Sequence, residues 1–145
     1  MKKTIIIVST ITAFFVLGAV IIAWSVYTKG DVGNVEVSGI RYFTDDNFKE
    51  QVVDASKNLP ILIDFYADWC FPCKLLEPTL QDLARDFRGK AVIGKIDTDK
   101  NMIARRFNLK QIPAVFVIRN GEIRDSFYGV PTKERLARAL RESGS

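Results

Sequence analysis

The chain has 145 residues, which suggests one domain with a short appendage, and 48% of them are apolar, enough to form a buried core. The formal net charge is +4, but the basic residues form no block interleaved with aromatic residues, so we expect no nucleic-acid partner. The chain has no histidine, which removes the usual general base and the commonest metal ligand, and we expect neither a metal nor another cofactor.

Residues 4–27 form an apolar segment without a single charged residue, directly after a start that carries two lysines. As a helix this segment would be about 36 Å long, and the hydrocarbon core of a membrane is about 30 Å thick. Trp24 and Tyr27 lie at its far end, where an interfacial aromatic belt would be. A cleaved signal peptide is the alternative, but its apolar region would be shorter, about 7–15 residues. We therefore expect residues 1–28 to be an uncleaved transmembrane signal anchor.

The charges around this segment predict its orientation. Two lysines precede it, whereas Lys29 and Asp31 cancel each other after it, so the N-terminus should stay in the cytoplasm. Residues 29–39 then form a short polar tether with three glycines. The remaining domain, residues 40–145, is expected on the outer side of the cell membrane, either periplasmic or at the cell surface.

From residue 40 onward, hydrophobic periodicity and turn signals predict alternating strands and helices. In chain order these are strand 40–43, helix 44–56, strand 61–67, helix 70–87, strand 91–97, helix 99–107, a strand pair in 114–128 and helix 132–142. Thr44 is expected to cap the first helix, and Asn120-Gly121 is a strong signal for a two-residue hairpin turn. The order β-α-β-α-β-α-β-β-α predicts an α/β fold with a mixed central sheet, parallel inside and with an antiparallel hairpin at one edge.

The two cysteines of the chain, Cys70 and Cys73, are three positions apart at the start of helix 70–87. A zinc site needs about four ligands, which this chain alone cannot supply, and a structural disulfide closing so short a loop would stabilise little. A redox-silent pair is a further alternative. Unpaired amides and the helix dipole favour an anion at Cys70, and the Cys-x-x-Cys spacing also lowers a thiol pKa. The pair is therefore predicted to be redox-active, with Cys73 the more buried thiol and Pro72 suited to the first helical turn.

The segment "ILIDFYADWCFPCKLLEP" (61–78), which contains both cysteines, resembles the corresponding segment of the thioredoxin family. Four further blocks follow the order and spacing of that family: "TDDNF", "GKAVIGKIDTD", "QIPAVFVIRNGE" and "FYGVPTKERLARAL". The resemblance covers the chain from residue 40 to about residue 142. It implies the thioredoxin fold, with helices on both faces of the sheet, and thiol–disulfide exchange through Cys70 and Cys73. Together with the predicted anchor, the chain is similar to membrane-tethered thioredoxin-like proteins of bacterial envelopes.

The resemblance assigns roles behind the cysteines. Asp64 corresponds to a buried acid, whose pKa burial should raise and which would accept the proton of Cys73. Its alternative is a solvent-exposed edge position. Lys95 corresponds to a lysine whose head lies near this acid and tunes it, and its alternative is an ordinary surface lysine.

The resemblance also assigns substrate-binding roles. Ile112-Pro113 corresponds to a cis-proline loop that presents its backbone to the substrate, and Gly129 would let the substrate approach closely, unless it is a simple turn glycine. Trp69 would cover the rim of the site, with a core tryptophan as the alternative. The family commonly has glycine-proline between the cysteines, whereas this chain has Phe71 and Pro72, and the bulky Phe71 should influence partner choice and redox potential.

These residues predict a membrane-tethered, extracytoplasmic reductase of protein disulfides. The Cys70 thiolate would attack the substrate and Cys73 would resolve the mixed disulfide. A transmembrane electron donor would then restore the reduced pair. A tethered disulfide oxidase or isomerase, and a non-catalytic chaperone or binding module with the same fold, are the alternatives.

Overall fold

The computed structural model describes residues 39–144. The predicted signal anchor and nearly all of the predicted tether lie outside the described residues. Within 39–144, no helix is both long enough and apolar enough to cross a membrane.

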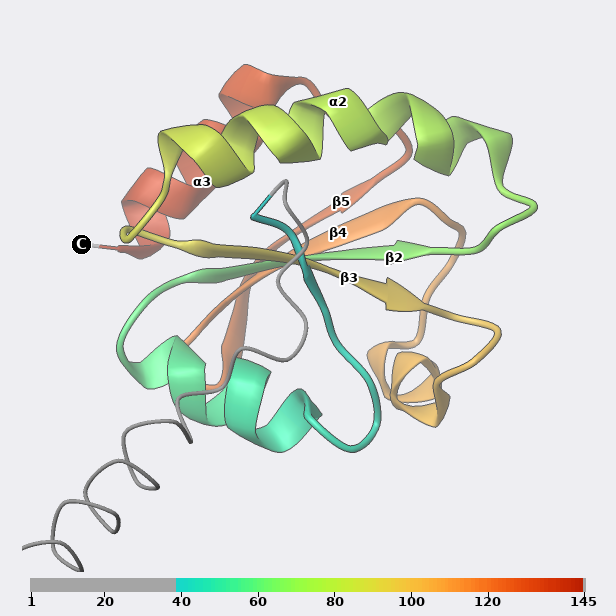
Figure 1. Ribbon diagram of the computed structural model, residues 1–145, viewed down its shortest axis with the longest axis horizontal. Coiled ribbons are helices and arrows are strands. Elements are labelled where there is room, and N and C mark those ends of the chain that lie inside the picture. Colours follow the sequence, from blue (N-terminus) through green and yellow to red (C-terminus); the bar gives the residue numbers. More distant parts are fainter. Residues whose placement is uncertain (1–38, 145) are drawn as a thin grey trace, which may run out of the picture. The chain divides into compact units, whose positions relative to one another are not determined.

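A mixed sheet forms the centre of the described domain (Figure 1). Its strands are β1 (Arg41–Tyr42), β2 (Ile61–Tyr66), β3 (Val92–Asp97), β4 (Ala114–Arg119) and β5 (Glu122–Tyr128), in the spatial order β1-β3-β2-β4-β5. Strands β1, β3 and β2 are parallel, while β4 pairs antiparallel with both β2 and β5. The predicted parallel interior with an antiparallel hairpin at one edge is confirmed.

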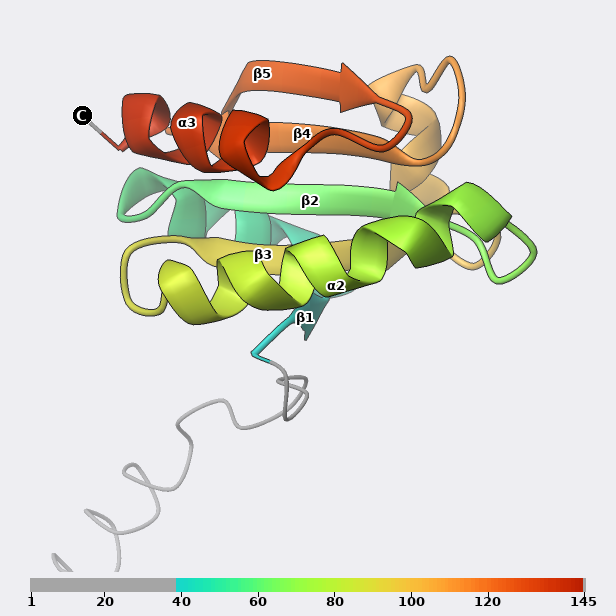
Figure 2. The same cartoon turned by 90° about the horizontal axis from the view of Figure 1, so that it is seen from above.

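Helices cover both faces of this sheet. The helices α2 (Phe71–Asp86) and α3 (Lys133–Ser143) lie side by side on one face (Figures 1 and 2). The opposite face is covered by three short helical segments, η1 (Lys49–Asp54), η2 (Ala55–Lys57) and η3 (Met102–Phe107). Cys70 and Cys73 lie at the N-terminal end of α2, a long helix that packs on the sheet.

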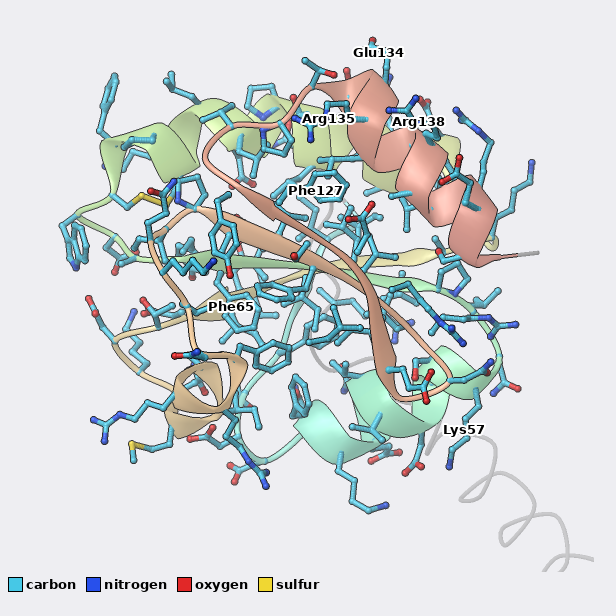
Figure 3. The ribbon with its side chains drawn as sticks, turned by 180° about the vertical axis from the view of Figure 1, so that it is seen from behind. Lys57, Phe65, Phe127, Glu134, Arg135 and Arg138 are labelled. Carbon is cyan, nitrogen blue, oxygen red and sulfur yellow. A yellow bond between two sulfur atoms is a disulfide. The ribbon has the colours of Figure 1, made fainter. Side chains whose placement is uncertain are left out.

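Strand β2 is buried on both sides, and its alternate side chains enter two separate cores. Leu62 packs in the core beneath α2 and α3, whereas Ile61, Ile63 and Phe65 pack in the core on the η-helix side. Figure 3 shows this division, with Phe127 on the α3 side of the sheet and Phe65 on the other. By this alternation Asp64, two positions after Leu62, belongs to the α2 side.

The turn between β4 and β5 forms where the sequence predicts it. Asn120 and Gly121 both have positive φ, at 57° and 75°, as a type I′ hairpin turn requires. The turn is anchored by the helical segment η2, because the buried hydroxyl of Ser56 accepts a hydrogen bond from the Gly121 N–H at 2.9 Å.

Two predicted helices differ from the structure. In 44–56, Thr44 makes no side-chain cap; its own N–H donates to Asn47 Oδ1 at 2.8 Å, and the regular segment is the π-helix η1 followed by the 3₁₀-helix η2. In 99–107, a 3₁₀-helix replaces the predicted α-helix. The carboxylate of Asp45 fixes the start of that helix by accepting hydrogen bonds from the N–H groups of Met102 and Ile103.

Candidate active site

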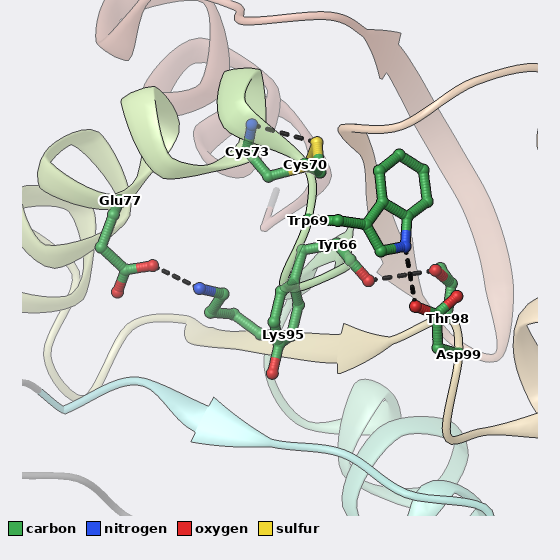
Figure 4. Close-up of a disulfide and its surroundings, with 8 residues drawn as sticks. All are labelled: Tyr66, Trp69, Cys70, Cys73, Glu77, Lys95, Thr98 and Asp99. Atoms are coloured by element: carbon green, nitrogen blue, oxygen red, sulfur yellow. Dashed lines mark hydrogen bonds and ion pairs between the residues drawn. A yellow bond between two sulfur atoms is a disulfide. The ribbon is translucent and has the colours of Figure 1, made fainter.

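Cys70 and Cys73 form a disulfide at the N-terminus of α2, with 5.3 Å between their Cα atoms. Cys70 has an extended backbone and caps the helix, because its Sγ accepts a hydrogen bond from the Cys73 N–H at 3.2 Å (Figure 4). The predicted difference in burial is absent in this disulfide form, since each cysteine is 3% exposed. The two differ in position instead: the sulfur of Cys70 accepts the Cys73 N–H at the N-terminus of the helix, where the helix dipole stabilises a thiolate.

Asp64 is a fully buried carboxyl group on β2. Its neighbours in the sheet are Lys95 on β3 and the apolar Val115 on β4. Neither of its carboxyl oxygens has a hydrogen-bond partner among the described residues. Desolvation by burial raises the pKa of Asp64 to about 7, although the charge of Lys95 acts in the opposite direction. A carboxyl group with this pKa exchanges its proton near neutral pH. Histidine, the side chain whose unperturbed pKa lies nearest neutral pH, is absent from the chain.

Lys95 is buried as well, at 7% exposure, and is not a surface lysine. Its ammonium group forms an ion pair with Glu77 on α2 and lies over the ring of Tyr66, 4.2 Å from the ring centroid (Figure 4). The lysine therefore lies beside Asp64 in the sheet, but its hydrogen-bonded counter-ion is Glu77.

A pocket of about 340 Å³ opens beside the disulfide. Its lining residues come from β1, β2, β3, the loop after β2, and α2, and they are Tyr42, Tyr66, Ala67, Asp68, Cys73, Lys74, Glu77 and Lys95. Asp64, which is fully buried, is the neighbour in the β2–β3 ladder of the lining residue Lys95. Cys73 and the Lys95–Glu77 pair thus share one cavity, and no group of three or more His, Cys, Asp or Glu side chains within 39–144 is arranged to hold a metal ion.

The rim of the site is apolar and exposed. Trp69 is 70% exposed and Phe71 is 69% exposed, so Trp69 is not a core residue. The indole Nε1 of Trp69 donates a hydrogen bond to Asp99 Oδ2 at 2.8 Å, which fixes the orientation of the ring. Pro72, next to Phe71, is exposed as well. These side chains form an exposed, mainly apolar rim around the start of α2.

The loop before β4 completes the other side of the site. The Ile112-Pro113 peptide bond is cis, and Ile112 packs against the cluster that contains both cysteines. Gly129 has a φ of +83°, and its N–H donates to the Pro113 carbonyl at 2.9 Å. Among residues 39–144, only the side chain of Gln111 approaches the place that a Gly129 Cβ would occupy, at 3.9 Å. Pro113 and Gly129, which are distant in sequence, are therefore held together, and Ile112 holds this loop against the cysteines.

Two residues at the site, Glu77 and Asp99, do not figure among those predicted from the sequence. For Glu77 a signal exists, because it follows Cys73 by four positions on a helix and so lies on the same helix face. For Asp99 none exists, because the loop that carries it reaches Trp69 only through the fold.

Comparisons with known proteins agree with this geometry. Residues 39–142 match the family model described as Thioredoxin. The chain is 37% identical over 105 residues to a thioredoxin of Chlorobaculum thiosulfatiphilum, an alignment that covers 70% of this chain and 95% of that protein. It is 43% identical over 98 residues to a thioredoxin of Staphylococcus haemolyticus, covering 67% and 90% of the two chains. The chain belongs to the thioredoxin family and is a thiol–disulfide oxidoreductase that acts on protein disulfides through Cys70 and Cys73.

Proposed function

We propose that this thioredoxin is tethered to the cell membrane by residues 1–28 and reduces protein disulfides on the outer side of that membrane. The tether rests on the uncharged run of residues 4–27 behind two lysines. The reducing direction rests on one observation at the site, which is the unpartnered, buried carboxyl of Asp64 on β2, the strand that leads to the cysteines.

The proposed reaction starts from the reduced pair. The thiolate of Cys70 attacks one sulfur of the substrate disulfide, which forms a mixed disulfide and releases the other substrate sulfur as a thiolate. Cys73 gives its proton to the carboxylate of Asp64, and the resulting thiolate attacks the Cys70 sulfur. The second substrate sulfur leaves as a thiolate, and the Cys70–Cys73 disulfide forms, as in the structure. Two electrons pass to the substrate, and a transmembrane electron donor returns two electrons to the pair.

The substrate is expected to lie across the rim as an extended segment. Backbone pairing with the loop before β4 would hold it in a way that tolerates different sequences. The residues proposed to contact the substrate are Trp69, Phe71, Pro72, Ile112, Pro113 and Gly129. The exposed ring of Phe71 would favour an apolar side chain next to the disulfide under attack.

Whether the pair reduces or oxidises its substrate follows from the stability of the Cys70 thiolate. Disulfide oxidants are driven by a strongly stabilised thiolate in their reduced form. In this chain an ionised Asp64 on the preceding strand would repel such a thiolate, and the apolar surface of Phe71 would disfavour it further. Since the chain has no histidine, no imidazolium is present to compensate.

The test is the redox state of the pair in intact cells of the source organism. The full chain should appear in the membrane fraction, should be digested by protease added outside the cytoplasmic membrane, and should be trapped mainly as the dithiol by rapid alkylation. A soluble cytoplasmic protein would overturn the tether, and a pair trapped mainly as the disulfide would favour the oxidase. A variant with both cysteines changed to serine should lose insulin reduction in dithiothreitol, because the exchange needs both thiols. Equal behaviour with and without the cysteines would instead indicate a binding module.

A further inference from the structure

Lys95 has two carboxyl groups within its surroundings but is hydrogen-bonded to only one. Its ammonium group lies between the ring of Tyr66 and the carboxylate of Glu77, to which it donates a hydrogen bond (Figure 4). The other carboxyl, Asp64, is its direct neighbour across the β2–β3 ladder. Yet Asp64 makes no hydrogen bond within the described part of the chain.

Glu77 is placed to act on this lysine from the same helix that carries the resolving cysteine. It follows Cys73 by one helical turn on α2, and both side chains line the pocket that Lys95 closes from the sheet side. The side chain of Glu77 is 30% exposed while that of Lys95 is 8% exposed, so the carboxylate of this pair reaches solvent and the lysine does so much less. Less water screens this partly buried ion pair than a surface pair, so the Coulomb attraction between Lys95 and Glu77 is stronger than that of two exposed side chains.

Other charged and titratable groups face the same pocket. They are Tyr42 from β1, Tyr66 from β2, Asp68 from the loop after β2 and Lys74 from α2. From the β4 side, the register partner of Asp64 is the uncharged Val115. Lys95 is the cation directly beside Asp64 in the sheet, so the partner of Lys95 decides how much positive charge Asp64 feels.

We propose that Glu77 is a positioning residue for proton transfer from Cys73: it binds Lys95 and so keeps the lysine from forming a salt bridge with Asp64. Held in this way, Lys95 compensates the charge of Asp64 only in part. Burial raises the pKa of Asp64 to about 7, Lys95 lowers it, and the negative charge of Glu77 raises it. Removal of Glu77 would free the lysine for Asp64 and remove a like charge, and both effects lower the same pKa.

The consequence concerns the resolving step. Asp64 takes the Cys73 proton, the Cys73 thiolate bonds to Cys70, and the substrate sulfur leaves with the electron pair of the broken bond. A carboxylate whose pKa is close to the operating pH is the most effective base for this transfer. The proposal rests on the role of Asp64 given above but not on the reducing direction. A reductase and an isomerase resolve the mixed disulfide by the same attack of Cys73 on the Cys70 sulfur.

The experiment uses the reduced full-length chain in detergent and 5,5′-dithiobis(2-nitrobenzoate) as the substrate. Attack by Cys70 releases one coloured thiolate, and resolution by Cys73 releases the second in a phase whose rate does not depend on reagent concentration. A Cys73→Ser variant identifies this second phase by losing it. Its rate is measured from about pH 5.5 to 9 and should rise around pH 7 in the native chain.

In Glu77→Gln the midpoint of this rise should fall by about 1 pH unit, because an opposite charge at close range lowers a carboxyl pKa by about that much or more. Glu134→Gln, which removes an exposed acid on α3, is the matched control and should leave the midpoint unchanged. If Glu77 acts through the lysine, Glu77→Gln should shift the midpoint much less when Lys95 is already changed to Met.

If the midpoint is unchanged in Glu77→Gln and Asp64→Asn abolishes the rise, the proposed role of Glu77 is overturned and the role of Asp64 stands. A rise that persists in Asp64→Asn would overturn both, because Asp64 would not be the titrating group. An equal shift with and without Lys95 would show that Glu77 acts by its own charge and would also contradict the proposal.

Discussion

Replacing Asp64 by asparagine is predicted to change how stability depends on pH. Asp64 is fully buried and its pKa is raised, so the folded protein holds the proton more tightly than the unfolded chain does. Well below pH 3.8 the group is protonated in both states and costs no ionisation energy. As the pH rises from about 4 to 7, the unfolded chain ionises first, and the folded protein loses stability relative to it.

The size of the effect follows from the two pKa values. That of Asp64 is 3.8 in an unstructured chain and about 7 in the fold. At about 1.4 kcal/mol for each pKa unit, the ionisable carboxyl costs the folded protein about 4 kcal/mol above pH 7. Asp64→Asn removes this cost and retains a polar group of similar shape, so the gain in stability over the native chain should grow by about 4 kcal/mol between pH 4 and pH 8.

The assay is equilibrium unfolding in urea, at several pH values, of the native chain and of Asp64→Asn, both with the disulfide intact. Other carboxyl groups contribute to both curves and cancel in the difference, and no histidine titrates in this range. A difference that stays flat between pH 4 and pH 8 would refute the reasoning, because it would mean that Asp64 ionises in the fold as readily as in water.

Three further predictions address the roles of the cysteines, the packing of the sheet and the domain boundary. Cys73→Ser should accumulate mixed disulfides with client proteins and Cys70→Ser few, as visible on non-reducing gels; the opposite pattern would exchange the two roles. Gly94→Ala should destabilise the domain by about 1–3 kcal/mol in urea unfolding, since its Cβ would stand 2.3 Å from the Phe43 ring, and an unaffected midpoint would contradict the tight contact. A chain beginning at Gly30 should be soluble, monomeric by size-exclusion chromatography and active on insulin; aggregation or inactivity would place part of 1–29 inside the fold.

Local sequence predicts much of this fold where local physics decides it. Asn120-Gly121 forms its turn because few other residue pairs adopt positive φ twice at low cost. Cys70 begins a helix because its own sulfur and Pro72 suit the first turn. Strand β2 is central because it is apolar on both faces.

Long-range contacts decide those parts of the structure that differ from the sequence-based predictions. The segment after Asn101 is a 3₁₀-helix whose first amides bind Asp45, a residue more than fifty positions earlier in the chain. The counter-ion of Lys95 is likewise set by the packing of α2 on β3, which brings Glu77 to a lysine that the β2–β3 ladder alone would assign to Asp64. Neither contact is encoded in the spacing of residues within one element.

The reduction potential of the Cys70–Cys73 pair tests the proposed reductase most directly. It is measured by equilibrating the protein with glutathione buffers and quantifying the dithiol. A typical thioredoxin has a potential of about −270 mV and a strong disulfide oxidant one of about −120 mV. With Asp64 buried on the strand that leads to the pair and no histidine in the chain, the potential should lie near the thioredoxin value. A potential near that of the strong oxidant would contradict the reductase and identify a disulfide donor.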